Sequence, residues 1–407
     1  MFLENNYKIL IKLYLSLITF LSIYYLSGVN LVLTYNAMTE WVINYQGGFV
    51  RRGLIGEIIF QISNFFELNL RFTFLILQSF LYLLYYYLIF NLIKNLRPNY
   101  FIILAVFSPI FILFPIAELE AIGRKEILIF ISLLISINLY FKYLSNNLII
   151  FFISAIYPLL LLTFEASIFY SFFFISLILI TKNKINFFYF LKLFFFSLPS
   201  LICLYMIYFN PHLPEETAKM CNELKKIGEE CGLAAAFISH KIDYHMAELD
   251  WKPNHILRYI LIFILGFSSL IYLSINSKFN EKFINSIFLK FPFVFHLIIL
   301  ILPTIIMFIV AVDTGRWTHM SYSCAFLYYF GLLKNNAIVL DNRQTNVIYL
   351  KKKTNNFIKI LIFIILCLSW NPKAVYHEDL GSIPIYRAIE KMPNFYNNIF
   401  KIEMLRR

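Results

Sequence analysis

Paired arginines followed by a carboxylate are the first residues of this chain that could do chemistry. The run at 47–54 reads Gly-Gly-Phe-Val-Arg-Arg-Gly-Leu, and Glu57 follows it. Two guanidinium forks match the oxygens of a phosphate group. We predict a short helix that begins near Phe49 and points its free N–H groups at an anion. Adjacent helical residues point about 100° apart, so one of Arg51 and Arg52 would face the ligand and the other Glu57.

A second group of acidic and basic residues lies between 118 and 126, in the run Glu-Leu-Glu-Ala-Ile-Gly-Arg-Lys-Glu. Arg124 and Lys125 could form a second phosphate clamp, and local ion pairing at a helix end is the alternative. Glu165 lies within an apolar stretch, where an ionisable group is a functional candidate by default. It would serve as a general base or as the partner of an arginine, unless it forms a purely structural ion pair.

The run Asp-Thr-Gly-Arg-Trp at 313–317 supplies a third charged motif. Asp313 and Arg316 are three residues apart, which places them on one helical face. Trp317 could stack on a sugar or anchor the helix at the membrane surface. Glu40, which precedes Trp41, is a weaker candidate for an acid or a base.

Motifs for metals and nucleotide cofactors are absent from the sequence. It has no HExxH, no CxxC, no P-loop and no glycine-rich dinucleotide fingerprint, so we expect neither a metal nor a cofactor. Cys221 and Cys231 are ten residues apart in a polar loop, and we predict a disulfide there if the loop is extracytoplasmic. The alternative is two free thiols.

The elements that position these residues must be membrane helices. Of 407 residues, 60% are hydrophobic and 14% are charged, whereas soluble domains carry about 25% charged residues. The net charge of +12 is spread between apolar runs, which argues against nucleic-acid binding. We predict one all-α integral membrane domain over 1–407. We expect about eleven spans of roughly 20 residues each. They are 9–33, 72–93, 100–117, 127–144, 148–163, 166–180, 190–209, 256–276, 291–312, 318–333 and 357–370.

The distribution of basic residues sets the orientation, because cytoplasmic loops are enriched in Lys and Arg. With a cytoplasmic N-terminus, 148–163 and 166–180 must be two spans that turn near Glu165. The basic loop 334–356 then faces the cytoplasm, while the loop 210–254 and the tail 371–407 face outward. In this orientation all the charged motifs share the outer face of the membrane.

This arrangement resembles bacterial O-antigen and capsule repeat-unit polymerases of the Wzy type, with the runs at 47–54 and 313–317 carrying the resemblance. The resemblance implies a bacterial inner-membrane protein that joins glycan units carried on polyprenyl diphosphate, with other polysaccharide-assembly proteins as possible partners. It assigns diphosphate and sugar binding to Arg51, Arg52, Arg124, Lys125, Arg316 and Trp317. The acid and base candidates are Glu165 and Asp313, followed by Glu57 and Glu40. The mid-chain outer loop is poor in arginine, which departs from the family pattern.

Two other classes of function stay open. A GT-C-type transferase would move one sugar from a polyprenyl phosphate, and that resemblance predicts a catalytic acid just after the first helix, near Glu40. A flippase for lipid-linked glycans would need charges along a path through the bilayer. His296 lies in a span, as an O-acyltransferase would require, but its surroundings favour a hydrogen-bonded structural histidine.

Overall fold

A computed structural model describes most of the chain. The described residues are 7–32, 36–97, 99–143, 146–180, 186–210, 214–232, 235, 238, 253–281, 291–311, 313–340, 355–374 and 383–389. Parts of the predicted outer loop, of the basic loop 334–356 and of the tail lie outside these ranges.

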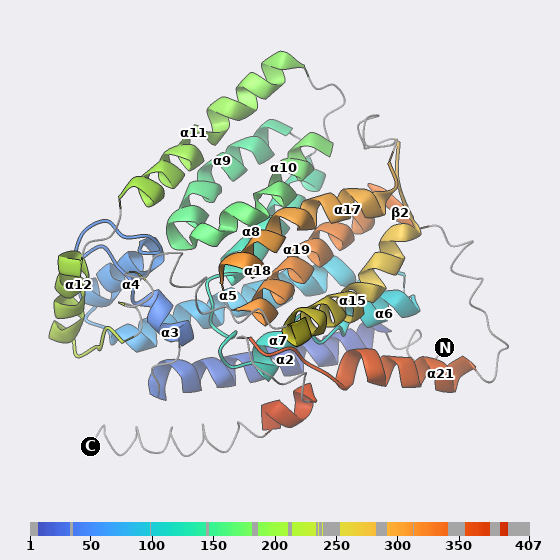
Figure 1. Cartoon of the computed structure of the whole chain (residues 1–407), viewed down its shortest axis with the longest axis horizontal. Helices are drawn as coiled ribbons and strands as arrows, with labels where there is room; N and C mark the ends of the chain where they lie inside the picture. Colours follow the sequence, from blue (N-terminus) through green and yellow to red (C-terminus); the bar gives the residue numbers. More distant parts are fainter. Residues whose placement is uncertain are drawn as a thin grey trace.

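The described part of the chain is a helical bundle with very little strand (Figure 1). Six of its helices are long and apolar enough to cross a membrane, which makes it a helical membrane protein. Four shorter apolar helices accompany them, so the predicted number of about eleven spans stays a prediction. The six are α2 (Tyr7–Val32), α5 (Leu70–Ile93), α9 (Asn146–Thr163), α11 (Phe187–Phe209), α15 (Pro253–Ile275), and the helical segment that contains α17 (Phe293–Ile301).

Asparagine side chains begin two of these helices. Asn69 accepts a hydrogen bond from the N–H of Phe72 at the start of α5, and Asn186 accepts one from Tyr189 at the start of α11. Each bond satisfies one of the N–H groups that the first helical turn leaves unpaired. The helices then present long apolar faces outward, and α11 carries exposed phenylalanines along its length. Outward apolar faces are expected where lipid is the solvent.

The turn predicted near Glu165 is present. Helix α9 ends at Thr163, and a 3-10 turn (η1, Glu165–Tyr170) leads into α10 (Ser171–Ile180). The rings of Tyr157 and Phe174 are 5.3 Å apart, whereas 17 residues of continuous helix would separate them by about 25 Å. The chain therefore folds back here, as two short segments and not one long helix.

Two predicted spans are interrupted. The segment 100–117 divides into α6 (Tyr100–Val106) and α7 (Phe114–Ala117), with a turn around Pro109, because proline cannot donate the backbone hydrogen bond that a helix requires. The segment 291–312 passes from α17 through a 3-10 turn (η2, Leu302–Ile305) at Pro303 to α18 (Ile306–Val310). Proline interruptions are tolerated in membrane helices because neighbouring helices and local 3-10 adjustments satisfy the freed backbone groups.

At the centre of the bundle lies α19 (Thr314–Lys334), which is buried along nearly its whole length. It packs against α5, α8 (Ile127–Tyr143), α15 and α17. At its C-terminal end, β2 (Ile338–Leu340) pairs with β1 (Ser277–Phe279), a small antiparallel ladder that the all-α prediction missed. α21 (Asn355–Phe363) continues into a π-helical turn, η3 (Ile364–Leu368).

Three short helices gather at the opposite end of the bundle, on the left in Figure 1. They are α3 (Asn36–Trp41), α4 (Leu54–Phe65) and α12 (Pro214–Lys226). The helix predicted near Phe49 is α4, and it begins at Leu54. Residues 42–53 form turns, so Arg51 and Arg52 precede the helix and do not belong to its first turn.

Candidate functional site

Charged side chains from four distant segments meet at the end of the bundle where α3 and α4 lie. We call them the ionic cluster, and its members are Glu40, Arg51, Arg52, Arg124, Lys125, Glu126, Glu165, Asp313 and Arg316. It brings together the charged motifs predicted from the sequence and adds Glu126, which had no predicted role although it ends the charged run at 118–126.

Glu40 lies at the centre of the cluster and is fully buried. Its Oε1 atom is 2.5 Å from Nη1 of Arg124, 3.4 Å from Nη1 of Arg316 and 3.7 Å from Nη1 of Arg52. Burial alone would raise the pKa of Glu40, but the surrounding positive charges outweigh burial and lower it to about 2. Glu40 is therefore a permanent anion that holds three arginines together. A group with this pKa is a poor general base at neutral pH.

Arg316 connects the motif at 313–317 to the cluster. It pairs with Glu126 and Glu40, and its Nη1 atom donates to Oδ2 of Asp313 over 2.9 Å. The predicted pair at spacing three is thus present. Its buried guanidinium lies 5.1 Å from the ring of Trp317, close enough for a cation–π contact. Trp317 is itself buried, so it supports Arg316 and does not present a ring for a sugar or for the membrane surface.

Four members form the accessible rim of the cluster. The side chains of Arg51, Arg52, Glu165 and Asp313 are 18 to 24% exposed, whereas those of Glu40, Glu126, Arg124 and Arg316 are 5% exposed or less. Lys125 is also fully buried. A ligand can reach the rim without unfolding the bundle, so the rim is where substrate chemistry would occur.

Glu165 is the carboxylate that the paired arginines contact. Both of its oxygens accept hydrogen bonds from Nε of Arg52, at 2.9 and 2.7 Å, and Oε1 is 3.6 Å from Nη1 of Arg51. The predicted partner, Glu57, instead accepts from the backbone N–H of Tyr45 and from the side chains of Gln46 and Gln61. Glu57 therefore holds the preceding turn in place, because the late start of α4 moves it away from the arginines.

Arg52 adopts an unusual backbone conformation. Its φ of 66° lies in the left-handed region, which side chains other than glycine rarely occupy. The ammonium group of Lys125 donates to the carbonyl of Arg52 over 2.7 Å. Burial, partly opposed by the charge of Glu40, lowers the pKa of Lys125 to about 7. Lys125 thus supports the turn at 47–53 that carries Arg51 and Arg52, which we call the arginine turn. It is not part of a phosphate clamp open to ligand.

The ion pairs of the segment 118–126 are long-range, whereas the sequence suggested either local ion pairing or a phosphate clamp. Arg124 reaches Glu40, and Glu118 pairs with Arg387 near the C-terminus. Gly123, with φ of 72°, turns its carbonyl toward the indole N–H of Trp41, which donates to it. The segment therefore links the α3 region to the C-terminal region, and only folding could reveal these partners.

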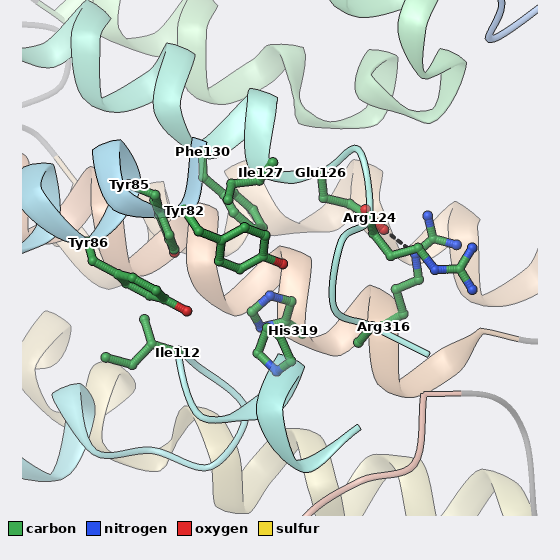
Figure 2. A pocket seen from close by; sticks show the side chains of 12 residues that line it. Tyr82, Tyr85, Tyr86, Ile112, Arg124, Glu126, Ile127, Phe130, Arg316 and His319 are labelled. Carbon is green, nitrogen blue, oxygen red and sulfur yellow. Dashed lines mark hydrogen bonds and ion pairs between the residues drawn. The ribbon is translucent and has the colours of Figure 1, made fainter. Parts of the chain in front are cut away.

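A small cavity lies directly behind Arg124 and Arg316 (Figure 2). Its aromatic wall comprises Tyr82, Tyr85, Tyr86, Phe130 and His319, and Glu126 joins the arginines at its polar end. One carboxylate oxygen of Glu126, Oε2, is buried without a hydrogen-bond partner. A polar atom in this position is usually satisfied by an ordered water.

The helix α12 covers the glycine pair of the arginine turn. A disulfide joins Cys221 on α12 to Cys231, which is the pair predicted from the sequence. Two residues before Cys231, the Oε2 atom of Glu229 is 2.9 Å from Nε of Arg71. A Cβ atom added to Gly47 would lie 1.9 Å from the backbone oxygen of Glu216. The residue at 47 must therefore be glycine for α12 to approach so closely.

Within the described residues, no group of three His, Cys, Asp or Glu side chains could hold a metal ion. His296 lies within the bundle, where its Nε2 atom is 2.9 Å from the hydroxyl of Ser176 and 3.0 Å from that of Tyr328.

Comparison with known proteins adds no relative from which a function could be transferred. No family model matches the chain, and no curated protein or solved structure matches it.

Proposed function

We propose that this protein transfers glycan units from polyprenyl phosphate or diphosphate carriers during surface-polysaccharide assembly, at the outer face of the bacterial inner membrane. The observation that carries the proposal is the rim of the ionic cluster. It places two arginines and two carboxylates, all partly exposed, at one end of an apolar helical bundle. Phosphate lipids present their charge at the membrane surface, and guanidinium groups bind phosphate oxygens well.

In this proposal each member of the rim has a separate chemical role. Arg51 and Arg52 would bind the phosphate oxygens, and their charges would stabilise the leaving phosphate. Both oxygens of Glu165 are engaged by Arg52, so Glu165 orients the arginines. Asp313 is bonded to Arg316 through one oxygen and is partly exposed, which leaves it better suited as the general base.

Arg52 of the rim and Arg316, which holds Asp313, lie against the same aromatic ring. The guanidinium carbons of Arg52 and Arg316 lie 5.6 and 5.5 Å from the centre of the same Phe164 ring. In the reaction, Asp313 would take the proton of an acceptor hydroxyl, whose oxygen then attacks the anomeric carbon. The bond from that carbon to the phosphate oxygen breaks, and the phosphate leaves with the electron pair.

The geometry favours this assignment over the two alternatives. A GT-C-type mechanism would need a carboxylate near Glu40 to act on substrate, whereas Glu40 is buried beneath three arginines. A flippase would need charges along the bilayer path, but the ion pairs of the ionic cluster and the pair Arg71 and Glu229 lie at one end, near α3, α4 and α12.

The polysaccharide profile of a deletion strain, compared on a gel with its complemented parent, tests the proposal. Lipid-linked chains shortened to a single repeat unit are the result expected of a polymerase. Complete loss of repeat units would identify a single-sugar transferase or a flippase instead. An unchanged ladder would refute any role in surface glycans.

A further inference from the structure

Phe164 lies in the turn between α9 and η1, directly before Glu165. Its backbone is extended, with φ of −157° and ψ of 99°, so α9 ends at Thr163 and the chain turns. The N–H of Phe164 donates to the carbonyl of Leu160 over 2.8 Å, and its carbonyl accepts from the N–H of Ser167 over 3.0 Å. The side chain is 2% exposed. The ring is therefore held in one place, because hydrogen bonds fix its backbone on both sides and protein atoms surround it.

Two arginines from distant segments place their guanidinium groups near this ring. The guanidinium carbon of Arg52 is 5.6 Å from the ring centre, and that of Arg316 is 5.5 Å from it. Both distances fall within the range of about 6 Å over which an aromatic ring attracts a cation, and the attraction grows where water is excluded. Arg316 is buried, and the side chain of Arg52 is only 18% exposed. An aliphatic side chain of similar volume would fill the space without attracting either charge.

The two guanidinium groups also repel each other. Their Nη1 atoms both lie near one oxygen, Oε1 of Glu40, at 3.7 Å for Arg52 and 3.4 Å for Arg316. Like charges that share one partner in a buried site repel strongly, because little water screens them. Glu40 compensates them with a full negative charge, and Phe164 adds the electron-rich face of its ring. Together these two residues keep the arginines at one spacing.

This spacing matters because the two arginines serve different parts of the proposed reaction. Arg52 belongs to the pair that would bind the phosphate, whereas Arg316 donates to Asp313, the proposed general base. A base must lie within hydrogen-bond reach of the hydroxyl that it activates. A misplacement of about 1 Å can cost about 100-fold in rate. The ring that both arginines contact therefore connects the phosphate site to the base.

We propose that Phe164 is a positioning residue, whose ring sets the distance between the phosphate-binding arginines and Asp313. This inference rests on the proposed function and adds a side chain that acts through the arginines and not on the substrate. It predicts that the aromatic character of residue 164 matters in addition to its size. A residue that only fills space would be replaceable by any apolar side chain of similar volume.

Phenylalanine analogues that carry one, two or three fluorine atoms on the ring test this role. Fluorine withdraws electron density from the face of the ring and weakens its attraction for a cation, while the shape of the ring changes little. The analogues are introduced at position 164 in a complemented deletion strain, and polysaccharide product is measured per amount of folded protein in the membrane. We expect product to fall with each added fluorine, to about one tenth for three. Phe164→Leu should lose a similar amount, whereas Phe164→Tyr, which keeps the ring, should retain most of the product.

The matched control is Phe173 on α10, which is fully buried and lies 5.9 Å from the neutral ring of Tyr328. The same analogues at position 173 should leave product unchanged. Constant product along the fluorine series at position 164 would overturn the positioning role and leave the proposed function standing, and full product from Phe164→Leu would do the same. The fluorine series decides the question even if Phe164→Leu does not fold. If the wild-type chain restored no product to the deletion strain, the proposed function itself would fail.

Discussion

Glu40 and Asp313 carry the same chemical group in opposite surroundings. Glu40 is fully buried and contacts three arginines, whereas Asp313 is 22% exposed and contacts only Arg316 among the ion pairs described. A buried carboxylate that compensates several cations stabilises the fold, and an accessible one is free to exchange a proton with substrate. The two residues should therefore respond differently to the same neutral substitution.

Asp313→Asn should abolish activity while leaving the protein folded. The amide keeps the shape of the side chain but loses the basic oxygen, and loss of a general base costs about 100-fold to 10,000-fold in rate. The measurement is polysaccharide chain length in a complemented deletion strain, with protein level followed by immunoblot. Glu57→Gln is the control and should retain product, because Glu57 only bonds to its own turn and helix. Normal chains from Asp313→Asn would remove Asp313 from the mechanism.

Glu40→Gln should destabilise the protein instead. Removing one partner from a buried ion pair costs about 3–5 kcal/mol, because the remaining charges stay desolvated and uncompensated. We expect a large fall in the midpoint of thermal unfolding, measured by scanning fluorimetry in detergent. A variant that keeps wild-type stability but lacks activity would support the GT-C-type mechanism, in which Glu40 acts on substrate.

Lys125 should make stability depend on pH. Its pKa is about 7 in the folded protein and 10.5 as an ordinary lysine. Between these values the unfolded chain binds the extra proton, so stability should rise with pH across this window, by up to about 1.4 kcal/mol per unit. Below about pH 7 both states are protonated and this dependence vanishes. Lys125→Met should flatten the difference between unfolding midpoints at pH 7 and pH 9, and an unchanged slope would contradict the assignment.

At the scale of residues, spacing in the sequence predicted only contacts between residues that are close together in the sequence. The pair Asp313 and Arg316 lies three residues apart on one helix and formed as expected. Glu40 and Arg124 are 84 residues apart, and no pattern within either segment indicates the other. The assignment of Glu57 to the arginines was wrong because it depended on where α4 begins. The first and last residues of a helix are the hardest part of it to predict from a sequence.

At the scale of elements, apolar runs predicted the helices well and their interruptions poorly. The ranges 9–33, 72–93 and 190–209 agree within a few residues with α2, α5 and α11. The range 100–117 was expected to be one span and instead divides into α6 and α7, because the surrounding helices can satisfy the backbone groups that a proline turn frees. The composition of the segment alone does not show which helices will pack around it.

Close backbone contacts between elements give a further prediction. A Cβ atom on Gly315 would lie 1.8 Å from the carbonyl oxygen of Lys373. Gly315→Ala should therefore displace the segment after η3 from the first turn of α19 and cost about 1–3 kcal/mol. Gly331→Ala on the same helix is the control, since its Cβ would meet only the side chain of Ile137, at 2.8 Å. Comparable unfolding midpoints for the two variants would contradict the need for glycine at 315.

At the scale of the whole molecule, charge is distributed unequally between the two ends of the bundle. The ionic cluster, α12 and the pair Arg71 and Glu229 lie at one end. The small sheet lies at the other, where burial and, after it, the nearby charge of Lys94 lower the pKa of Lys334. Lysines that lie close together at one end of a membrane bundle are typical of a cytoplasmic membrane surface, where anionic lipids compensate them. The disulfide of α12 fits the oxidising side of the membrane.

Cysteine labelling in intact cells tests this orientation. Lys225, exposed on α12 next to the disulfide, and Asn336, next to β2, are the two reporter positions, each introduced as a single added cysteine. A membrane-impermeant maleimide should label Lys225→Cys from outside, and Asn336→Cys only after the cells are opened. Labelling with the opposite pattern would place the rim on the cytoplasmic side. The carrier would then have to be met before it crosses the membrane, and the proposed outer-face reaction would have to be abandoned.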